Sequence, residues 1–180
     1  MRLKELEKNQ AGFTIFELLV SIFIIALISG TFLTNYRSGG KRSELLSLAQ
    51  KLASDIRIAQ SYSLGAKETA AGTMPAGGWG VFFNKTTPQT YTLFADTSGN
   101  FQRESTEDYT IVNIPPNVEI NSITLNGVSV NSVDVAFCPP DPKVYINGLL
   151  NQSAQIIIKE KDTNATKTIN INSLGLIEVN

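Results

Sequence analysis

Histidine is absent from the 180-residue sequence, and other reactive residues are scarce. Without histidine the chain lacks the commonest general base, any Ser/His/Asp or Cys/His nucleophile, and the ligand used in most zinc sites. Cysteine occurs once, at Cys138, so an intramolecular disulfide is excluded. We expect Cys138 to be a small apolar residue that ends a strand, with an intermolecular bridge or a reactive thiol as the alternatives.

Charge is also scarce in this chain. Charged residues make up 17% of it and the formal net charge is −1, so the composition predicts no general affinity for polyanions. The carboxylates that could serve in catalysis are scattered through predicted strands and loops: Asp134, Asp141, Glu160 and Glu178. We therefore predict no catalytic residues, no cofactor and no metal site, and we do not expect an enzyme.

The segment Asp96–Asn100 is the nearest approach to a metal-binding loop, because it offers several oxygen ligands around Gly99. An EF-hand would need further carboxylates and a closing glutamate at fixed spacing, and the sequence does not supply them. We expect a plain hairpin turn at this position.

What the chain does have is one long apolar run, from Phe13 to Leu33, in which Glu17 is the only charged residue. At about 1.5 Å per residue, a helix of this length spans roughly 31 Å, which is enough to cross a bilayer core. A cleaved signal peptide has a shorter apolar stretch followed by small residues, whereas here Ala11 and Gly12 precede the run. We therefore predict a membrane helix that stays in the mature protein.

Glu17 lies just inside this run, where a carboxylate is costly. At the centre of a membrane helix it costs about 2.5–3.5 kcal/mol, and less near the end. A cut after Gly12 would give Phe13 a free α-amine, and the i, i+4 spacing would place this amine and Glu17 on one helix face. Cleavage would thus convert a costly charge into a paired one, within a helix or between neighbours. The alternative is a glutamate at the headgroup boundary.

Gly12, Phe13, Thr14 and Glu17, followed by an unbroken apolar stretch, resemble the class III signal of type IV prepilins and pseudopilins. The resemblance implies that a prepilin peptidase cuts between Gly12 and Phe13 and methylates the new amine of Phe13. It makes residues 1–12 a short polar leader and Glu17 a residue that acts in filament assembly.

The charges that flank the run do not fix its orientation by the positive-inside rule. Basic residues are equal in number on its two sides: Arg2, Lys4 and Lys8 before it, and Arg37, Lys41 and Arg42 after it. The resemblance implies a cytoplasmic N-terminus in the bacterial inner membrane, an extracytoplasmic domain, and later a filament. The partners it implies are the prepilin peptidase, other pilins or pseudopilins along the N-terminal helix, an inner-membrane assembly platform, and membrane lipid before assembly.

An amphipathic helix is predicted over residues 35–62, with the Gly39–Gly40 pair as a weak point near its start. Apolar residues recur there at intervals of three and four and form one stripe: Leu45, Leu48, Ala49, Leu52, Ala53, Ile56 and Ala59. We expect the stripe to pack on the domain's own sheet, with contact to neighbouring subunits as the alternative.

Short apolar stretches separated by turn signals predict an antiparallel β-rich domain over residues 63–180. The expected strands are Trp79–Phe83, Tyr91–Ala95, Tyr109–Ile114, Val118–Leu125, Val128–Phe137, Gln155–Lys159, Lys167–Ile171 and Leu176–Val179. The fold class is thus α+β, with a long N-terminal transmembrane α-helix over residues 13–34, an amphipathic continuation, and this β-rich globular domain.

Two details of the β-domain follow from the alternation of apolar residues. Val128 and Val130 alternate in one phase and Val133 in the other, which predicts a bulge near Asn131–Ser132. Four isoleucines are spaced to share the inner face of a terminal hairpin with its tip at residues 162–165: Ile156, Ile158, Ile169 and Ile171.

This layout resembles the GspH/FimT-type (H-type) pseudopilins and minor pilins. In that subfamily a strand like Gly77–Phe83 pairs with one like Tyr91–Asp96, and a strand like Val133–Phe137 leads to a final strand like Leu174–Val179. The resemblance implies a structural subunit, either of a type II secretion pseudopilus or of a type IV pilus.

Two other functions stay open. Lys159, Lys161 and Lys167 cluster near the last hairpin, and DNA-uptake minor pilins use basic surfaces to neutralise phosphates. Glu160 and Asp162 interleave with these lysines and no aromatic residue lies among them, so we expect a solvated hairpin, and nucleic-acid binding is unsupported. The second alternative is an uncleaved, signal-anchored protein whose β-domain is a receptor or an enzyme.

Overall fold

The computed structural model describes residues 12–140 and 143–180, without the side chains of residues 33–38. The chain divides into two compact units, residues 1–40 and residues 41–180. The predicted leader up to Ala11 and the carboxylate of Asp141 lie outside the described residues.

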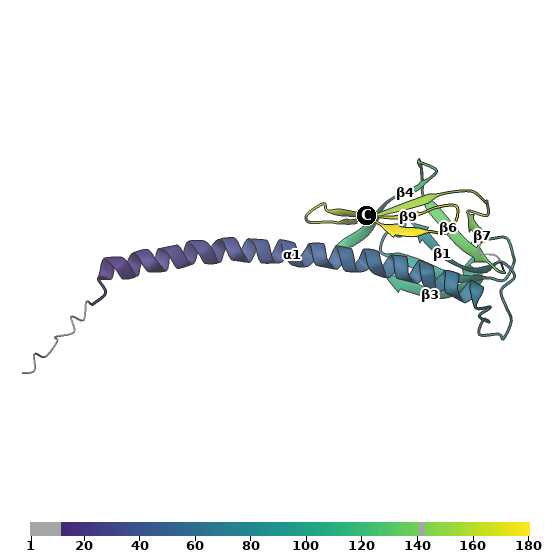
Figure 1. The fold of residues 1–180 in the computed structure, drawn as a ribbon, viewed down its shortest axis with the longest axis horizontal. Helices are drawn as coiled ribbons and strands as arrows, with labels where there is room; N and C mark the ends of the chain where they lie inside the picture. Colours follow the sequence, from purple (N-terminus) through teal and green to yellow (C-terminus); the bar gives the residue numbers. More distant parts are fainter. Residues whose placement is uncertain (1–11, 141–142) are drawn as a thin grey trace, which may run out of the picture. The chain divides into compact units, whose positions relative to one another are not determined.

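A single helix, α1 (Ile15–Leu64), contains both of the predicted helical segments (Figure 1). Gly39 and Gly40, which were expected to weaken the helix, lie within it. Glycine lowers helix stability by about 1 kcal/mol relative to alanine but keeps its N–H, whereas proline would break the hydrogen-bond ladder. Because no proline occurs between Ile15 and Leu64, the helical conformation continues through the glycine pair.

The second unit contains two five-stranded antiparallel sheets, which confirms the predicted fold class. The first sheet has the order β3-β2-β1-β6-β7, and the second has the order β10-β9-β8-β4-β5. The strands are β1 (Gly78–Asn84), β2 (Thr90–Asp96), β3 (Asp108–Asn113), β4 (Val118–Leu125), β5 (Val128–Val130), β6 (Ser132–Cys138), β7 (Lys143–Ile146), β8 (Ala154–Glu160), β9 (Thr166–Ile171) and β10 (Ile177–Val179).

The apolar stripe of α1 packs into the core of this unit, as predicted. All seven of its residues, from Leu45 to Ala59, are buried in one cluster with residues of both sheets, such as Val81 and Ile156. Polar contacts flank the stripe. Tyr91 donates a hydrogen bond to Asp55, and Arg57 donates one of 2.8 Å to the carbonyl of Ile177. The helix is thereby fixed to a strand of each sheet.

The bulge predicted near Asn131 is wrong, because the chain changes sheets at this residue. Val128–Val130 (β5) pairs with β4 in the second sheet, and Ser132–Cys138 (β6) pairs with β1 in the first. Each strand is ordered by its own sheet, so the apolar alternation restarts after Asn131. True register shifts occur elsewhere, between Ile120 and Ser122 in β4 and between Leu93 and Phe94 in β2.

The terminal hairpin forms as predicted. Ile156 pairs with Ile169 across β8 and β9, and the four predicted inner isoleucines are all buried. Strand β7 (Lys143–Ile146) escaped prediction because it is a short edge strand with only two buried apolar residues, Val144 and Ile146.

The connection between β2 and β3 is longer than the plain hairpin turn that was expected, and two buried carboxylates organise it. The carboxylate of Asp96 accepts the backbone N–H groups of Gly99 at 2.7 Å and Phe101 at 2.6 Å. Oε1 of Glu107 accepts those of Thr97 and Ser98, each at 2.9 Å. Within the described residues, no group of three His, Cys, Asp or Glu side chains could hold a metal ion.

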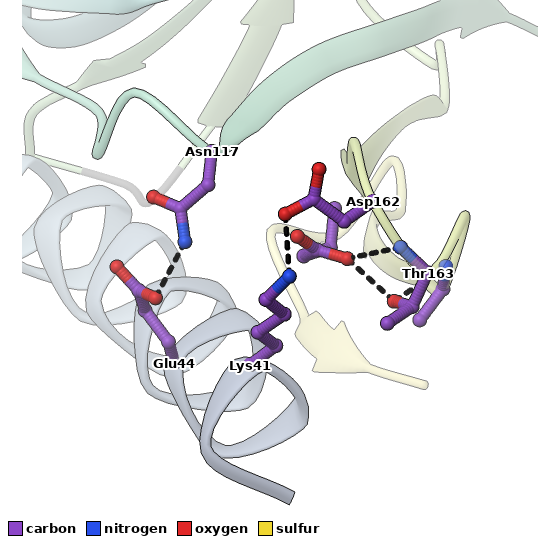
Figure 2. A network of polar contacts seen from close by, with 7 residues as sticks. Lys41, Glu44, Asn117, Asp162 and Thr163 are labelled. Atoms are coloured by element: carbon purple, nitrogen blue, oxygen red, sulfur yellow. Dashed lines mark hydrogen bonds and ion pairs between the residues drawn. The ribbon is translucent and has the colours of Figure 1, made fainter. Parts of the chain in front are cut away.

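The part of α1 that belongs to the second unit begins at Lys41, and polar contacts connect it to the tip of the terminal hairpin (Figure 2). Lys41 Nζ lies 2.5 Å from Asp162 Oδ2, and Asn117 Nδ2 donates to Glu44 Oε2 at 2.7 Å. These contacts join the helix to the β8–β9 tip and to the segment before β4, so the hairpin tip has a structural role.

Candidate assembly site on the N-terminal helix

Helix α1 begins immediately after the predicted cleavage site. Thr14 is its N-cap: the Thr14 Oγ1 atom accepts the backbone N–H of Glu17 at 3.2 Å, and the Thr14 carbonyl accepts that of Leu18 at 3.1 Å. A threonine followed three residues later by glutamate is the sequence pattern of a capping box. Thr14 is therefore a functional residue whose capping role went unpredicted, although this pattern would have revealed it.

Gly12 and Phe13 precede the helix and are exposed. Apart from Gly12 itself and its chain neighbours, no described atom lies within 4 Å of the position that a Cβ on Gly12 would occupy, so a side chain there would point into open space. Since Phe13 lies before the N-cap, helical geometry does not fix its backbone nitrogen, an amide in the uncut chain, beside Glu17. The i, i+4 pairing of these two residues stays a prediction for the processed chain.

Glu17 lies in the first turn of α1 and is exposed. The unpaired N–H groups and the positive end of the helix dipole favour a carboxylate at this end. One turn further on, Ser21 Oγ donates to the carbonyl of Glu17 at 2.7 Å, and Thr31 Oγ1 donates to that of Ile28 at 2.8 Å. These hydroxyls are satisfied by the backbone of the helix itself, which suits an apolar environment.

Apolar side chains lie on every side of the helix from Ile15 to Phe32, interrupted by Glu17 and a few hydroxyl residues. This segment is long and apolar enough to cross a membrane, and none of it is buried within the described chain. Phe16 is 77% exposed and Ile25 is 63% exposed. A helix that is hydrophobic all round is buried in a protein core or in a membrane. This segment therefore needs partners from outside the described fold.

Two of the three lysines considered for nucleic-acid binding lie beside an acidic residue, Glu119. Lys161 donates to the carbonyl of Pro116 at 2.8 Å and lies 3.8 Å from Glu119, while Lys159 is the cross-strand partner of Glu119. Lys167 pairs with Ile158 in the neighbouring strand. The expected solvated hairpin agrees with these contacts better than a continuous basic surface does.

The remaining candidate residues have structural surroundings. Cys138 ends strand β6 as predicted, and burial raises the pKa of its thiol, which favours the less reactive protonated form. Asp134 accepts the backbone N–H of Arg103 at 2.9 Å, and burial raises its pKa. Glu160 is buried and accepts two hydrogen bonds from Thr163, which lower its pKa, while Glu178 is exposed on β10.

Comparison with known families agrees with this geometry. Residues 8–33 match the family model described as the prokaryotic N-terminal methylation motif, a stretch that includes Gly12, Phe13 and Glu17. The match supports a type IV pilin-like protein, implies processing by a prepilin peptidase and pilin partners, and, with the apolar helix, indicates anchoring in the inner membrane. No curated protein and no solved structure matches the chain.

Proposed function

We propose that the protein is a minor pilin or pseudopilin, a structural subunit of a type IV pilus or of a type II secretion pseudopilus. The observation that carries this proposal is an unburied helix segment that starts two residues after Phe13 and is apolar except for Glu17 in its first turn and a few hydroxyl residues. Such a helix serves two purposes in one chain. It anchors the subunit in lipid, and it packs against the N-terminal helices of other pilins or pseudopilins in a filament core.

The proposed topology is a cytoplasmic leader, a helix that crosses the inner membrane, and an extracytoplasmic β-domain. Strands Gly78–Asn84 and Thr90–Asp96 pair in antiparallel fashion. This pairing supports assignment to the GspH/FimT-type subfamily, because two strands of this kind are expected to pair in its members. The work of the subunit is structural rather than enzymatic, and the prepilin peptidase and an assembly platform are its partners in maturation.

In the proposed mechanism, cleavage after Gly12 creates an ammonium group on Phe13 that pairs with Glu17 of a neighbouring subunit. Leaving one member of a buried charge pair without its partner costs about 3–5 kcal/mol. Only a helix inserted at the correct stagger would bring the two charges together, so the pairing selects register during filament growth.

A Glu17→Ala variant tests this mechanism, with Ser21→Ala as the matched control one turn away. We expect Glu17→Ala to reduce filament yield at least tenfold, because the amine of Phe13 is left unpaired in an apolar core. Ser21→Ala removes a hydroxyl that donates to the Glu17 carbonyl of the same helix and should assemble normally. Normal filament yield from Glu17→Ala, in protein whose β-domain melts like the wild type, would refute the proposed role.

A further inference from the structure

Three aromatic rings in the second unit form a corner around the amine of Lys67. Tyr62 is near the end of α1, Trp79 is on β1 and Tyr109 is on β3. Their planes are nearly perpendicular to one another, at 70° for Tyr62 and Trp79, 88° for Tyr62 and Tyr109, and 87° for Trp79 and Tyr109. The three rings line a corner whose Tyr109 wall is 46% exposed, and their negative faces surround the Lys67 amine on several sides; we name these three residues the aromatic cage.

The Lys67 amine occupies this cage. The Nζ atom lies 3.5 Å from the ring centre of Tyr62, 4.7 Å from that of Tyr109 and 5.3 Å from that of Trp79. These distances fall within the range of cation–π attraction. The Nζ atom also lies 3.1 Å from the Tyr109 hydroxyl. Burial alone would lower the pKa of Lys67, but contacts with the two tyrosines outweigh it and the pKa is raised.

No carboxylate shares in holding this amine. Among the salt bridges of residues 12–140 and 143–180, none includes Lys67. The cage therefore binds an ammonium group through rings and a phenol, which is the chemistry that also recognises alkylated ammonium ions without an N–H to donate.

The main chain of Lys67 is fixed independently of its side chain. Ala66 adopts a left-handed conformation with φ of 50°, and the N–H of Lys67 donates to the Tyr62 carbonyl at 2.9 Å, the pattern of a Schellman motif. The indole Nε1 of Trp79 donates to the Lys67 carbonyl at 3.0 Å. Because both hydrogen bonds use main-chain atoms, the side chain can leave the cage while the turn and the rings stay in place.

A cavity of about 280 Å³ adjoins the cage and shares Tyr109 with it. Its lining also includes Thr69, Glu107 and Asp108. Glu107 is ionised against backbone N–H groups, and Asp108 is paired with Arg103. Because both carboxylates already have partners, this cavity offers a ligand space rather than charge, and a ligand whose ammonium enters the cage would find room there for the rest of its body.

From this geometry we propose that the aromatic cage is a binding site for alkylammonium groups and that Lys67 is its built-in, displaceable occupant. The wild-type protein holds the site closed with its own amine. A ligand must displace that amine, so its apparent affinity is reduced by the fraction of molecules in which the cage is occupied. The cage uses only the end of α1 at Tyr62, so the proposal does not depend on the assembly role proposed for Glu17.

Trp79 is the only tryptophan in the chain, so its fluorescence reports on the cage directly. We would titrate the full-length protein in detergent with tetramethylammonium chloride, using sodium chloride at equal ionic strength as the reference. The variants are Lys67→Ala, which empties the cage, and Lys67→Ala with Tyr109→Leu, which removes one wall. We expect a saturable change in Lys67→Ala with a half-saturation concentration about tenfold or more below that of the wild type.

The double variant should lose this response. The proposal is overturned if folded Lys67→Ala shows no saturable change, or if the double variant responds as strongly as Lys67→Ala. Should Lys67→Ala fail to fold, the wild-type titration decides, because a displaceable lysine predicts a saturable change at high tetramethylammonium concentration and a fixed one predicts none. Parallel titrations then compare two kinds of ligand. Choline represents a small quaternary ammonium ion, and Nα-acetyl-lysine amide represents the ammonium of a protein side chain.

Discussion

The two units of the chain treat their apolar side chains in opposite ways, although helix α1 runs through both. In the first unit, large apolar residues cover the whole helix circumference and stay exposed, as Phe16 and Leu19 do. In the second unit most of them form a single buried stripe, in which Leu52 is 1% exposed and Ile56 0%, while other leucines of this part of the helix stay exposed. The distribution of apolar residues around the helix therefore indicates what covers each part. The stripe is covered by the protein's own β-domain, and the apolar segment needs lipid or other helices.

The two units also differ in whether their carboxylates are buried and hydrogen-bonded within the chain. Glu107 in the second unit is buried and bound by backbone N–H groups of its own loop. Glu17 in the first unit is exposed, in a segment that membrane or neighbouring helices would cover. The partners of Glu107 lie within its own domain, so its role is structural. Those of Glu17 would come from outside the described chain, which makes Glu17 a candidate for filament assembly.

The largest expected effect contrasts one leucine from each unit. Leu52→Ala should lower the free energy of unfolding of the β-domain by about 2–5 kcal/mol, because it opens a cavity in the core. Leu19→Ala is the matched control and should change it by less than about 0.5 kcal/mol, since Leu19 is exposed. Chemical denaturation of the detergent-solubilised protein, followed by Trp79 fluorescence, measures both. Equal destabilisation by the two variants would contradict the claim that only the second unit buries its apolar residues within the chain.

A Glu107→Gln change sharpens the comparison of carboxylates. At neutral pH it should cost about 1–3 kcal/mol, because the neutral amide replaces an ionised acceptor of several N–H groups. Burial alone would raise the pKa of Glu107, but hydrogen bonds from Ser98, Glu104 and Thr97 lower it below its ordinary value of 4.5. The stabilisation is thus present above about pH 4.5 and is lost as the pH falls through the folded-state pKa.

Unfolding of wild type and Glu107→Gln over a pH series tests this expectation. The difference between them should shrink as the solution is acidified below about pH 4.5. A difference that stays constant with pH would mean that the carboxylate charge of Glu107 does not contribute.

The smallest expected effect concerns the end of α1, where Ala66 adopts a left-handed conformation. Ala66→Gly should stabilise the β-domain by about 0.5–1 kcal/mol, because glycine adopts this conformation without steric cost. Ser54→Gly is the control at an exposed position inside the helix and should destabilise by about 0.5 kcal/mol. Thermal unfolding of both variants measures the two shifts, and shifts of the same sign would contradict the assigned helix end.

Features that depend on local periodicity could be predicted from the sequence. The stripe from Leu45 to Ala59 and the isoleucines of the β8–β9 hairpin were recognised because neighbouring residues alone determine which face they occupy. The resemblance to prepilins predicts processing at Gly12 and Phe13 and an assembly role for Glu17; the motif match covers these residues, and their roles stay predictions.

Features that depend on distant residues could not be predicted. The change of sheet at Asn131 follows from the pairing of β6 with β1, which lies far away in sequence. The cage around Lys67 combines a helix end, a strand of the sheet and an edge strand, and no spacing links Tyr62 with Tyr109. Glu160 is buried because strand register places it on an inner face, although its charge alone would indicate the surface.

The mass of the mature protein tests the central claim most directly, namely that Phe13 becomes a methylated N-terminus. Intact-mass spectrometry of protein extracted from membranes should give residues 13–180 plus one methyl group. Gly12→Val, which adds a branched side chain where a peptidase must approach the backbone, should keep the unprocessed mass. A wild-type mass that includes residues 1–12 would contradict the account and favour an uncleaved, signal-anchored protein.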